Sequence, residues 1–385
     1  MAFESEIASL NEHFFFEEFT YSTNTFRPNP STELELADSI IWIDDMLVLF
    51  QLKEREKISR TSPEREARWF ERKVIGVGTK QIRDSMKYMD VHRSILLRNH
   101  RGHRFELRRD AIAGLHKVIC YHGNSRLPEA CRGKKFHISR TVGTIHVIAA
   151  HDYLGVVRTV LTPFELAEYL AFRQELIEKW GDAVLPVPEP ALVGQYLEGD
   201  ANRKPDPAFR DVLKSLDHRA DEWDMSGVIK LFAERMTTET RDTEYYVILK
   251  ELAKLKRNEL REFKTRFLLS KEKCRSGEFT RPYRMASPRT DCGFVFIPLT
   301  EDEDEVRQRT LMTLTRACKY DLKLPKCVGA SFCPEEGGRY SVEWCYIEQP
   351  WSYDEELERK LKENNPFREV RTMELPRYGF RGAAE

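Results

Sequence analysis

Two short apolar runs separated by a pair of aspartates constrain this chain more than any other stretch. Ser39–Ile43 and Met46–Leu52 are rich in β-branched and large apolar residues, and each has the length of one strand. Only Asp44 and Asp45 stand between them, and by length and composition they form a tight turn. The sequence therefore predicts an antiparallel β-hairpin at this point of the chain.

Three polar side chains flank the predicted hairpin. Because strand residues alternate between the two faces, Gln51 and Lys53 project together from the end of the second strand. Asp38 enters the first strand, so its carboxylate can lie opposite that end. A carboxylate, an amide oxygen and an ammonium group then meet at one sheet edge. This set suits phosphodiester hydrolysis, because oxygen ligands hold Mg²⁺ and a lysine stabilises the charge that develops on the phosphoryl group.

Helices and further strands are predicted around the hairpin. The first helix, over 3–16, follows from four apolar residues at helical spacing, namely Phe3, Ile7, Leu10 and Phe14. Pro63 opens a second helix over 64–88, with a break at 76–78. The other elements predicted in the first half are strands over 94–97, 104–107, 117–121 and 144–149 and a helix from Pro163 to about Trp180.

The spacing of the three polar residues resembles a known active-site signature. Asp38, twelve intervening residues and then Gln51-x-Lys53 across a hairpin are similar to the signature of the restriction-endonuclease-like (PD-(D/E)XK) nuclease superfamily. Gln51 stands where most members carry an acidic ligand. The helix before the hairpin and the helix after it match the α-β-β-β-α-β order of that core. The resemblance covers roughly residues 1–150.

This resemblance implies both a fold and an activity. The implied fold class is mixed α/β, with a restriction-endonuclease-like α-β-β-β-α-β core followed by a smaller α+β domain. The implied activity is that of a Mg²⁺-dependent nuclease, for which Mn²⁺ could substitute, acting on DNA with RNA as the alternative. Asp38 and Gln51 would bind the metal, and Lys53 would stabilise the phosphoryl transition state.

A second carboxylate is expected at the metal site, because an amide at Gln51 removes one negative charge. Superfamily members often take that carboxylate from the first helix. With the apolar stripe of that helix facing inward, Glu6 lies at the border of the stripe and Glu12 almost opposite it. Glu6 is therefore the predicted ligand and Glu12 is excluded, while Glu17 and Glu35 remain candidates.

The helix after Lys53 carries a polar and basic set that includes Lys73, Lys80 and Gln81. In the superfamily such a helix lines the active site and can touch the scissile phosphate, so the resemblance implies nucleic-acid contacts for these three residues. The competing interpretation is a solvated amphipathic helix without a ligand.

Proline content sets the expected domain boundaries. Five prolines between 181 and 208 predict a linker there, between a nuclease domain over 1–180 and a helical, then α+β, domain over 209–385. The second domain would control the substrate, oligomerisation or a partner. Its predicted elements are a helical stretch over 226–270, strands over 293–299, 326–333 and 340–347, and helices over 303–320 and 354–364.

Charge and composition limit the kinds of partner and the location that this protein can have. The formal net charge is −1, yet residues 1–50 hold ten acids and one base, while residues 51–110 hold seventeen bases and nine acids. A net charge near zero is therefore compatible with a local positive field that attracts nucleic acid. No apolar run approaches the roughly 18–20 residues of a membrane helix, and the acidic N-terminus is unlike a secretory signal. A cytoplasmic protein without a membrane partner is expected.

An alternative function is a catalytically silent nuclease fold that binds nucleic acid or assembles a complex, with Gln51 as a sign of lost activity. Superfamily members of this size without an ATP motor resemble restriction, repair or anti-phage effectors, and no phosphate-binding ATP loop occurs here. The resemblance thus implies a role in prokaryotic restriction or antiviral defence. A homo-oligomer or a companion defence protein would then be the partner besides DNA.

Overall fold

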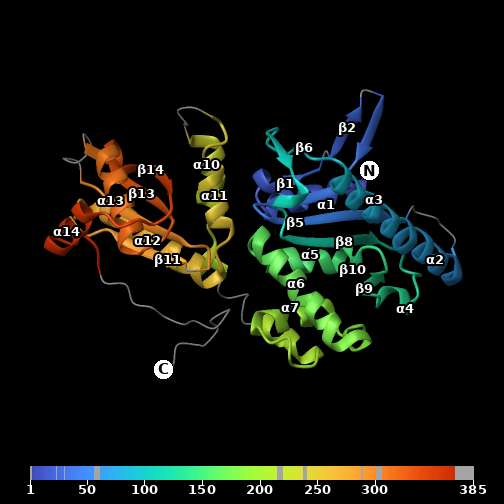
Figure 1. Ribbon diagram of the computed structural model, residues 1–385. Helices are drawn as coiled ribbons and strands as arrows, with labels where there is room; N and C mark the ends of the chain where they lie inside the picture. Colours follow the sequence, from blue (N-terminus) through green and yellow to red (C-terminus); the bar gives the residue numbers. More distant parts are fainter. Residues whose placement is uncertain are drawn as a thin grey trace. The chain divides into compact units, whose positions relative to one another are not determined.

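The computed structural model describes residues 2–22, 24–29, 31–55, 61–214, 220–236, 241–287, 289–300 and 306–368. The protein is mixed α/β, which confirms that part of the predicted fold class, and it consists of two compact units, residues 1–217 and 218–385 (Figure 1). None of the helices in the described ranges combines the length and the apolar character needed to cross a membrane.

A six-stranded mixed sheet forms the centre of the first unit, in the order β1-β4-β5-β8-β10-β9. The predicted hairpin is confirmed as β4 and β5, which pair antiparallel, and β8 and β10 continue the sheet parallel to β5. The strands are β1 (Thr20–Tyr21), β4 (Ser39–Ile43), β5 (Met46–Glu54), β8 (Gly114–His122), β9 (Phe136–Ser139) and β10 (Gly143–Ala149). Two small hairpins lie outside this sheet, β2 (Thr25–Asn29) with β3 (Thr32–Glu35) and β6 (Ile95–Arg98) with β7 (Arg104–Leu107).

One continuous helical segment covers the face of the sheet to which Gln51 and Lys53 belong. It consists of α2 (Pro63–Trp69), the π-helical turns η2 (Phe70–Val77) and α3 (Gly78–Val91). The break expected at 76–78 is therefore a change of helix type. At Gly78 a Cβ atom would lie 2.8 Å from Ile119 Cδ1, so glycine there lets the helix approach β8 closely.

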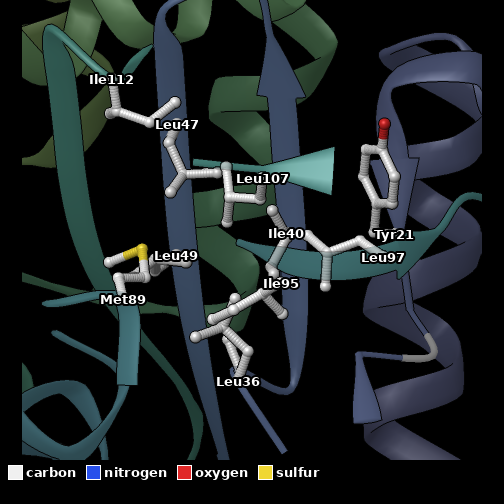
Figure 2. Close-up of a cluster of buried hydrophobic side chains, with 11 residues drawn as sticks. Tyr21, Leu36, Ile40, Leu47, Leu49, Met89, Ile95, Leu97, Leu107 and Ile112 are labelled. Atoms are coloured by element: carbon white, nitrogen blue, oxygen red, sulfur yellow. The ribbon is translucent and has the colours of Figure 1, made fainter. Parts of the chain in front are cut away.

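The hydrophobic cluster beneath α3 fixes the hairpin against the small β6–β7 pair. Figure 2 shows Leu47 and Leu49 of β5 and Ile40 of β4 among side chains of these neighbouring elements. Met89 closes the cluster from the end of α3. Strand alternation places Leu47, Leu49, Gln51 and Lys53 on this same face, so the apolar cluster passes directly into the polar end of β5.

The opposite face of the sheet is covered by α1 (Ala2–Phe14), α5 (Ala150–Thr159) and α6 (Pro163–Trp180). Phe50 of β5 packs edge-to-face on Tyr153 of α5, with ring centroids 5.4 Å apart. Phe3 of α1 packs in the same way on His122 at the end of β8. The other elements of this unit are η1 (Glu17–Phe19), η3 (Arg109–Ala111), α4 (Glu129–Arg132), η4 (Gly181–Val184), α7 (Glu189–Glu198), η5 (Pro207–Arg210) and α8 (Asp211–Lys214).

The proline-rich stretch 181–208, expected to be a linker, is instead an integral part of the first unit. It contains α7, most of whose residues are buried, and α7 packs on α5 and α6. Three of the five prolines lie where helices begin: Pro188 and Pro190 start α7, and Pro207 starts η5. Proline favours that position because its nitrogen needs no hydrogen-bond acceptor there, so the same composition fits a linker or a row of helix starts.

A buried charged network ties α7 to the sheet. Glu189 at the start of α7 accepts hydrogen bonds from Arg173 Nε at 2.7 Å and from Lys135 Nζ at 3.2 Å. Arg173 of α6 has no exposed side-chain area and also donates to the carbonyl oxygens of Lys135 and Val147. Arg173 Nη1 lies 3.1 Å from His146 Nδ1. Because each charge has partners, this network holds α6, α7 and β10 together.

The second unit packs helices on a four-stranded mixed sheet of order β11-β12-β13-β14. Its strands are β11 (Tyr283–Ser287), β12 (Cys292–Pro298), β13 (Lys326–Glu335) and β14 (Arg339–Glu348). Its helices are α9 (Ala220–Trp223), α10 (Ser226–Arg235), α11 (Tyr246–Ala253), α12 (Arg257–Ser276), α13 (Arg307–Asp321), η7 (Glu336–Gly338) and α14 (Glu355–Glu363). The helical stretch expected over 226–270 is thus three helices, α10 to α12.

The Glu189→Gln substitution should destabilise the protein by roughly 3 kcal/mol, because it leaves the buried guanidinium of Arg173 without its countercharge. Chemical denaturation of the full chain measures this loss. The matched control is Glu198→Gln, at the exposed end of the same helix, which should leave the free energy of unfolding nearly unchanged. Equal stability of the two variants would mean that α7 does not depend on this network.

Two buried histidines should make the stability fall in mild acid. Burial, followed by the charge of Lys117, lowers the pKa of His116 to about 4, and burial with Arg173 lowers the pKa of His146 well below its usual value. The unfolded chain therefore binds more protons than the folded protein below pH ~6.5. Stability should be full above that pH and fall by about 1.4 kcal/mol per pH unit for each histidine as the pH approaches 4.

Thermal melts at pH values from about 8 to about 4 test this expectation, because stability should change with pH over that range. His116→Gln should flatten part of the decline, because His146 keeps its own contribution. The control variant His13→Gln, at an exposed position of α1, should follow the wild-type profile. A His116→Gln profile as steep as that of the wild type would contradict the assignment.

Candidate functional site

The register of the hairpin places Asp38 beside Gln51. Asp44 adopts the left-handed conformation at φ 55°, which aspartate tolerates, and so allows a two-residue turn. Ser39 then pairs with Phe50, so the preceding residue, Asp38, comes opposite Gln51. The backbone N–H of Asp38 donates to the carbonyl oxygen of Phe50 at 3.1 Å, which extends the pairing to this residue.

Asp38 and Lys53 are in direct contact. The Oδ2 atom of Asp38 accepts hydrogen bonds from the backbone N–H of Leu52 at 2.6 Å and from Lys53 Nζ at 3.3 Å. Lys53 Nζ also donates to the carbonyl oxygen of Leu52 at 2.7 Å. Only 12% of the Lys53 side chain and 10% of the Asp38 side chain are exposed. The carboxylate and the ammonium group are therefore held in fixed positions at the end of β5.

Two amide oxygens near this pair are buried without a hydrogen-bond partner. Gln51 is 3% exposed, and its Oε1 atom has no donor among the described residues; the same holds for Oε1 of Gln81 on α3. Ser85, one turn after Gln81, donates to the carbonyl oxygen of Leu36 and so fixes this turn of α3 near Asp38. A buried acceptor without a partner costs about 1–3 kcal/mol. Asn24 Oδ1 and Gln195 Oε1 are buried without a partner too, so it is the position opposite Asp38 that sets Gln51 apart.

A further carboxylate, Glu35, interacts electrostatically with Asp38 and Lys53, and also with Glu4. Burial, and after it the negative charges of Asp38 and Glu4, raise the pKa of Glu35, while Lys53 opposes the shift. Glu35 lies at the end of β3 and Glu4 in the first turn of α1. Glu6, the residue predicted from the first helix, is exposed and is not among the charges that shift Glu35.

Glu4 was not predicted as a site residue, because the apolar stripe of a helix has two borders and only the border that carries Glu6 was considered. At 100° per residue, Glu4 and Glu6 flank the apolar stripe on opposite sides, and the wheel alone does not say which border faces the end of the sheet. The excluded Glu12 pairs with His100 Nδ1 at 2.8 Å, and Glu17 pairs with Arg101 Nε at 2.9 Å.

The two predicted lysines lie on the surface of the helical segment after β5. Lys80 is exposed and its Nζ lies 2.8 Å from Asp84 Oδ2, an i,i+4 pair of the kind common on solvated helices. Lys73, in η2, is also exposed and has no ion-pair partner within the described ranges. Of the three residues predicted for nucleic-acid contacts, Gln81 lies one turn before Ser85, whose hydroxyl donates to the carbonyl oxygen of Leu36, two residues before Asp38.

The oxygen atoms at the end of β5 fit a magnesium ion that keeps much of its water. No group of three or more His, Cys, Asp or Glu side chains in the described part of the chain could hold a metal ion. Asp38 Oδ1 and Gln51 Oε1, however, have no hydrogen-bond donor there. Magnesium often takes one or two carboxylates and completes its octahedron with water and substrate phosphate. An unpaired amide oxygen beside a carboxylate suits that arrangement.

Comparisons of the chain with protein-family models, with curated proteins and with solved structures found no match. The proposal of a function below is based on the positions of Asp38, Gln51 and Lys53.

The Gln51→Met substitution should raise the free energy of unfolding by about 1 kcal/mol in the presence of EDTA. It removes a buried acceptor that has no partner and keeps a side chain of similar length. Urea denaturation measures the change. As a control, Gln174→Met on α6 removes a glutamine whose Nε2 donates to Glu178 at 2.8 Å, and should be neutral or destabilising. A larger loss at Gln51 than at Gln174 would show that Gln51 has a structural role.

Proposed function

We propose that this protein is a Mg²⁺-dependent nuclease that hydrolyses phosphodiester bonds, with DNA as its substrate. The observation that carries the proposal is the contact of Asp38 with Lys53 beside the unpaired Oε1 of Gln51. A carboxylate, a free amide oxygen and an ammonium group converge at the end of one strand. Each of these groups has a role in phosphoryl transfer that the others lack.

The order of elements in the first unit supports the same proposal. Helix α1 is followed by β1, the β4–β5 hairpin, the helical segment α2–α3 and then β8 parallel to β5. With the β2–β3 and β6–β7 hairpins left aside, this succession is compatible with the α-β-β-β-α-β order that the resemblance to the restriction-endonuclease-like superfamily implies. The additional strand β10 lies beyond β8 and is parallel to it.

In the proposed reaction, Asp38 and Gln51 hold the metal and Lys53 acts on the phosphate. A bound Mg²⁺ ion supplies a Lewis acid for the phosphoryl oxygen and lowers the pKa of a water nucleophile. Lys53, already oriented by Asp38 and by the carbonyl oxygen of Leu52, presents its ammonium group where negative charge develops. Glu35 is a candidate for the second carboxylate, because the charges of Asp38 and Lys53 act on it, and Glu4 is a second candidate because its charge acts on Glu35.

Asp38→Ala and Lys53→Ala should each lower DNA cleavage by roughly 100-fold or more, because each removes a group that acts on the reacting phosphate. Cleavage of plasmid and single-stranded DNA by the purified full chain with Mg²⁺ or Mn²⁺ measures the effect. Asp84→Ala is the matched control, since its carboxylate pairs with the exposed Lys80 and should be dispensable. Cleavage that persists in both site variants would refute the site.

The Gln51→Glu variant separates an active site from a silent one. It restores the acidic ligand that most superfamily members carry, so it should support cleavage at a lower Mg²⁺ concentration than the wild type needs. Gln308→Glu, on an exposed turn of α13, adds the same charge elsewhere and should change nothing. If only Gln51→Glu cleaves, while the wild type binds nucleic acid in a salt-sensitive way, the protein is a silent binding module.

A further inference from the structure

The β6–β7 hairpin packs on the same face of the central sheet as the polar end of β5. Its inner side chains Ile95, Leu97 and Leu107 belong to the hydrophobic cluster of Figure 2. Leu36, two residues before Asp38, belongs to the same cluster. The hairpin is therefore attached to the sheet through a cluster that reaches close to the proposed active site, and its other face is turned away from the sheet.

Two arginines stand directly opposite each other on that outer face. Arg98 of β6 and Arg104 of β7 are register partners, and both residues are exposed. Neither forms an ion pair with an acid in the described part of the chain. The acid on this face, Glu106, is the register partner of Leu96 instead. Because like charges directly opposite each other destabilise a strand pair, this arrangement lowers the stability of the free protein.

Other polar residues of the same stretch anchor the turn between β6 and β7. Arg101 Nε lies 3.1 Å from Glu18 Oε1 in η1, and His100 Nδ1 lies 2.8 Å from Glu12 Oε1 in α1. The buried Asn99 donates through Nδ2 to the carbonyl oxygen of Glu18 at 2.9 Å. The basic residues of the hairpin thus divide into a set that holds the turn on α1 and η1 and an opposed pair that faces outward.

The turn also fixes the guanidinium group of Arg98. Arg98 Nε donates to the carbonyl oxygen of Gly102 at 3.3 Å. Gly102 has φ 87°, in the left-handed region, and a Cβ atom there would lie 3.1 Å from Arg98 Nη2. Glycine therefore lets the guanidinium lie against the turn, with its terminal nitrogens left as donors. An arginine that is already oriented loses less conformational entropy when it binds.

The distance between the hairpin and the active site suits a DNA duplex. Arg98 lies three residues beyond Ile95, about 10 Å along β6. Leu36 lies at most about 7 Å from Asp38 along the chain, and Ile95 and Leu36 share one cluster. One turn of B-DNA is about 34 Å long, so a duplex that reaches the end of β5 also spans the hairpin. This continuity favours DNA over an acidic protein segment.

We propose, on the basis of the proposed nuclease function, that Arg98 and Arg104 bind the phosphate backbone of duplex DNA. The Cβ atoms of opposed strand residues lie about 5 Å apart, so the two guanidinium groups hold one phosphate or two successive ones. Arginine forms bidentate, charge-assisted hydrogen bonds with phosphate oxygens. The bound anion compensates the two like charges. These contacts position the duplex and do not read its sequence.

Binding of a labelled DNA duplex to the full chain in EDTA tests the site without requiring catalysis. Arg98→Gln and Arg104→Gln should each weaken binding about fivefold or more and lower the slope of log affinity against log salt concentration by about one. Arg140→Gln is the matched control, because Arg140 is exposed in the turn before β10, at the opposite edge of the sheet from β1. The proposal is overturned if both site variants bind as the control does.

A charge reversal separates binding from folding. Arg104→Glu places a carboxylate opposite Arg98, so it should raise the midpoint of urea denaturation. The same change should weaken duplex binding more than Arg104→Gln does, because a carboxylate repels phosphate. A variant that loses stability would show that the opposed arginines serve the fold, and that result would contradict the proposal.

Competition identifies the occupant. A second, unlabelled duplex should displace the labelled one at a much lower charge concentration than poly-glutamate does. Equal displacement by poly-glutamate would assign the hairpin to an acidic protein segment and overturn the proposal.

The Asp38→Ala variant distinguishes this inference from the proposed nuclease activity. It should lose DNA cleavage and still bind the duplex in EDTA through Arg98 and Arg104. If the wild type cleaves DNA and its affinity does not depend on these arginines, the hairpin proposal alone fails. If the wild type cleaves nothing and its affinity does depend on them, the nuclease proposal fails and the binding site remains.

Discussion

Strand β5 pairs with β4 on one side and with β8 on the other, and the first unit depends on these two pairings. The parallel pairing with β8 runs along the whole of β5, from Met46 to Glu54. The antiparallel pairing with β4 brings Asp38 opposite Gln51. Because β5 is held on both edges and is buried on both faces for most of its length, the side chains at its end have little freedom. Rigid elements of this kind position reacting groups better than loops do.

Two polar clusters of the first unit, one around Glu189 and one around Gln51, differ in how well their hydrogen bonds are satisfied. Arg173 and Glu189 have partners on every side and connect helices to the sheet. At the end of β5, in contrast, Gln51 Oε1 is buried without any donor in the described part of the chain. A satisfied network contributes to stability, whereas an unsatisfied acceptor lowers it. This difference supports the proposal of an active site at Gln51 and a structural role for Glu189.

Residues near one another in sequence were predicted well, and residues brought together by packing were not. The hairpin, the helix starts at Pro63 and Pro163 and the contact between Asp38 and Lys53 follow from local rules of turn, cap and alternation. The stretch 181–208 was expected to be a linker because proline breaks regular structure. Three of its prolines instead begin helices of the first unit, and one of these helices, α7, is largely buried. Composition does not distinguish these two uses of proline.

The sequence by itself determined the hairpin and the side chains that its end presents, because alternation and turn length depend only on neighbouring residues. Tertiary structure decided which helix border meets that end, and so brought Glu4 rather than Glu6 into the electrostatic surroundings of Glu35. It also decided that β8 pairs parallel with β5 and that β10 pairs parallel with β8, which places the ends of the three strands at one edge of the sheet. Both outcomes depend on contacts between residues far apart in the chain, and such contacts are set by packing rather than by local pattern.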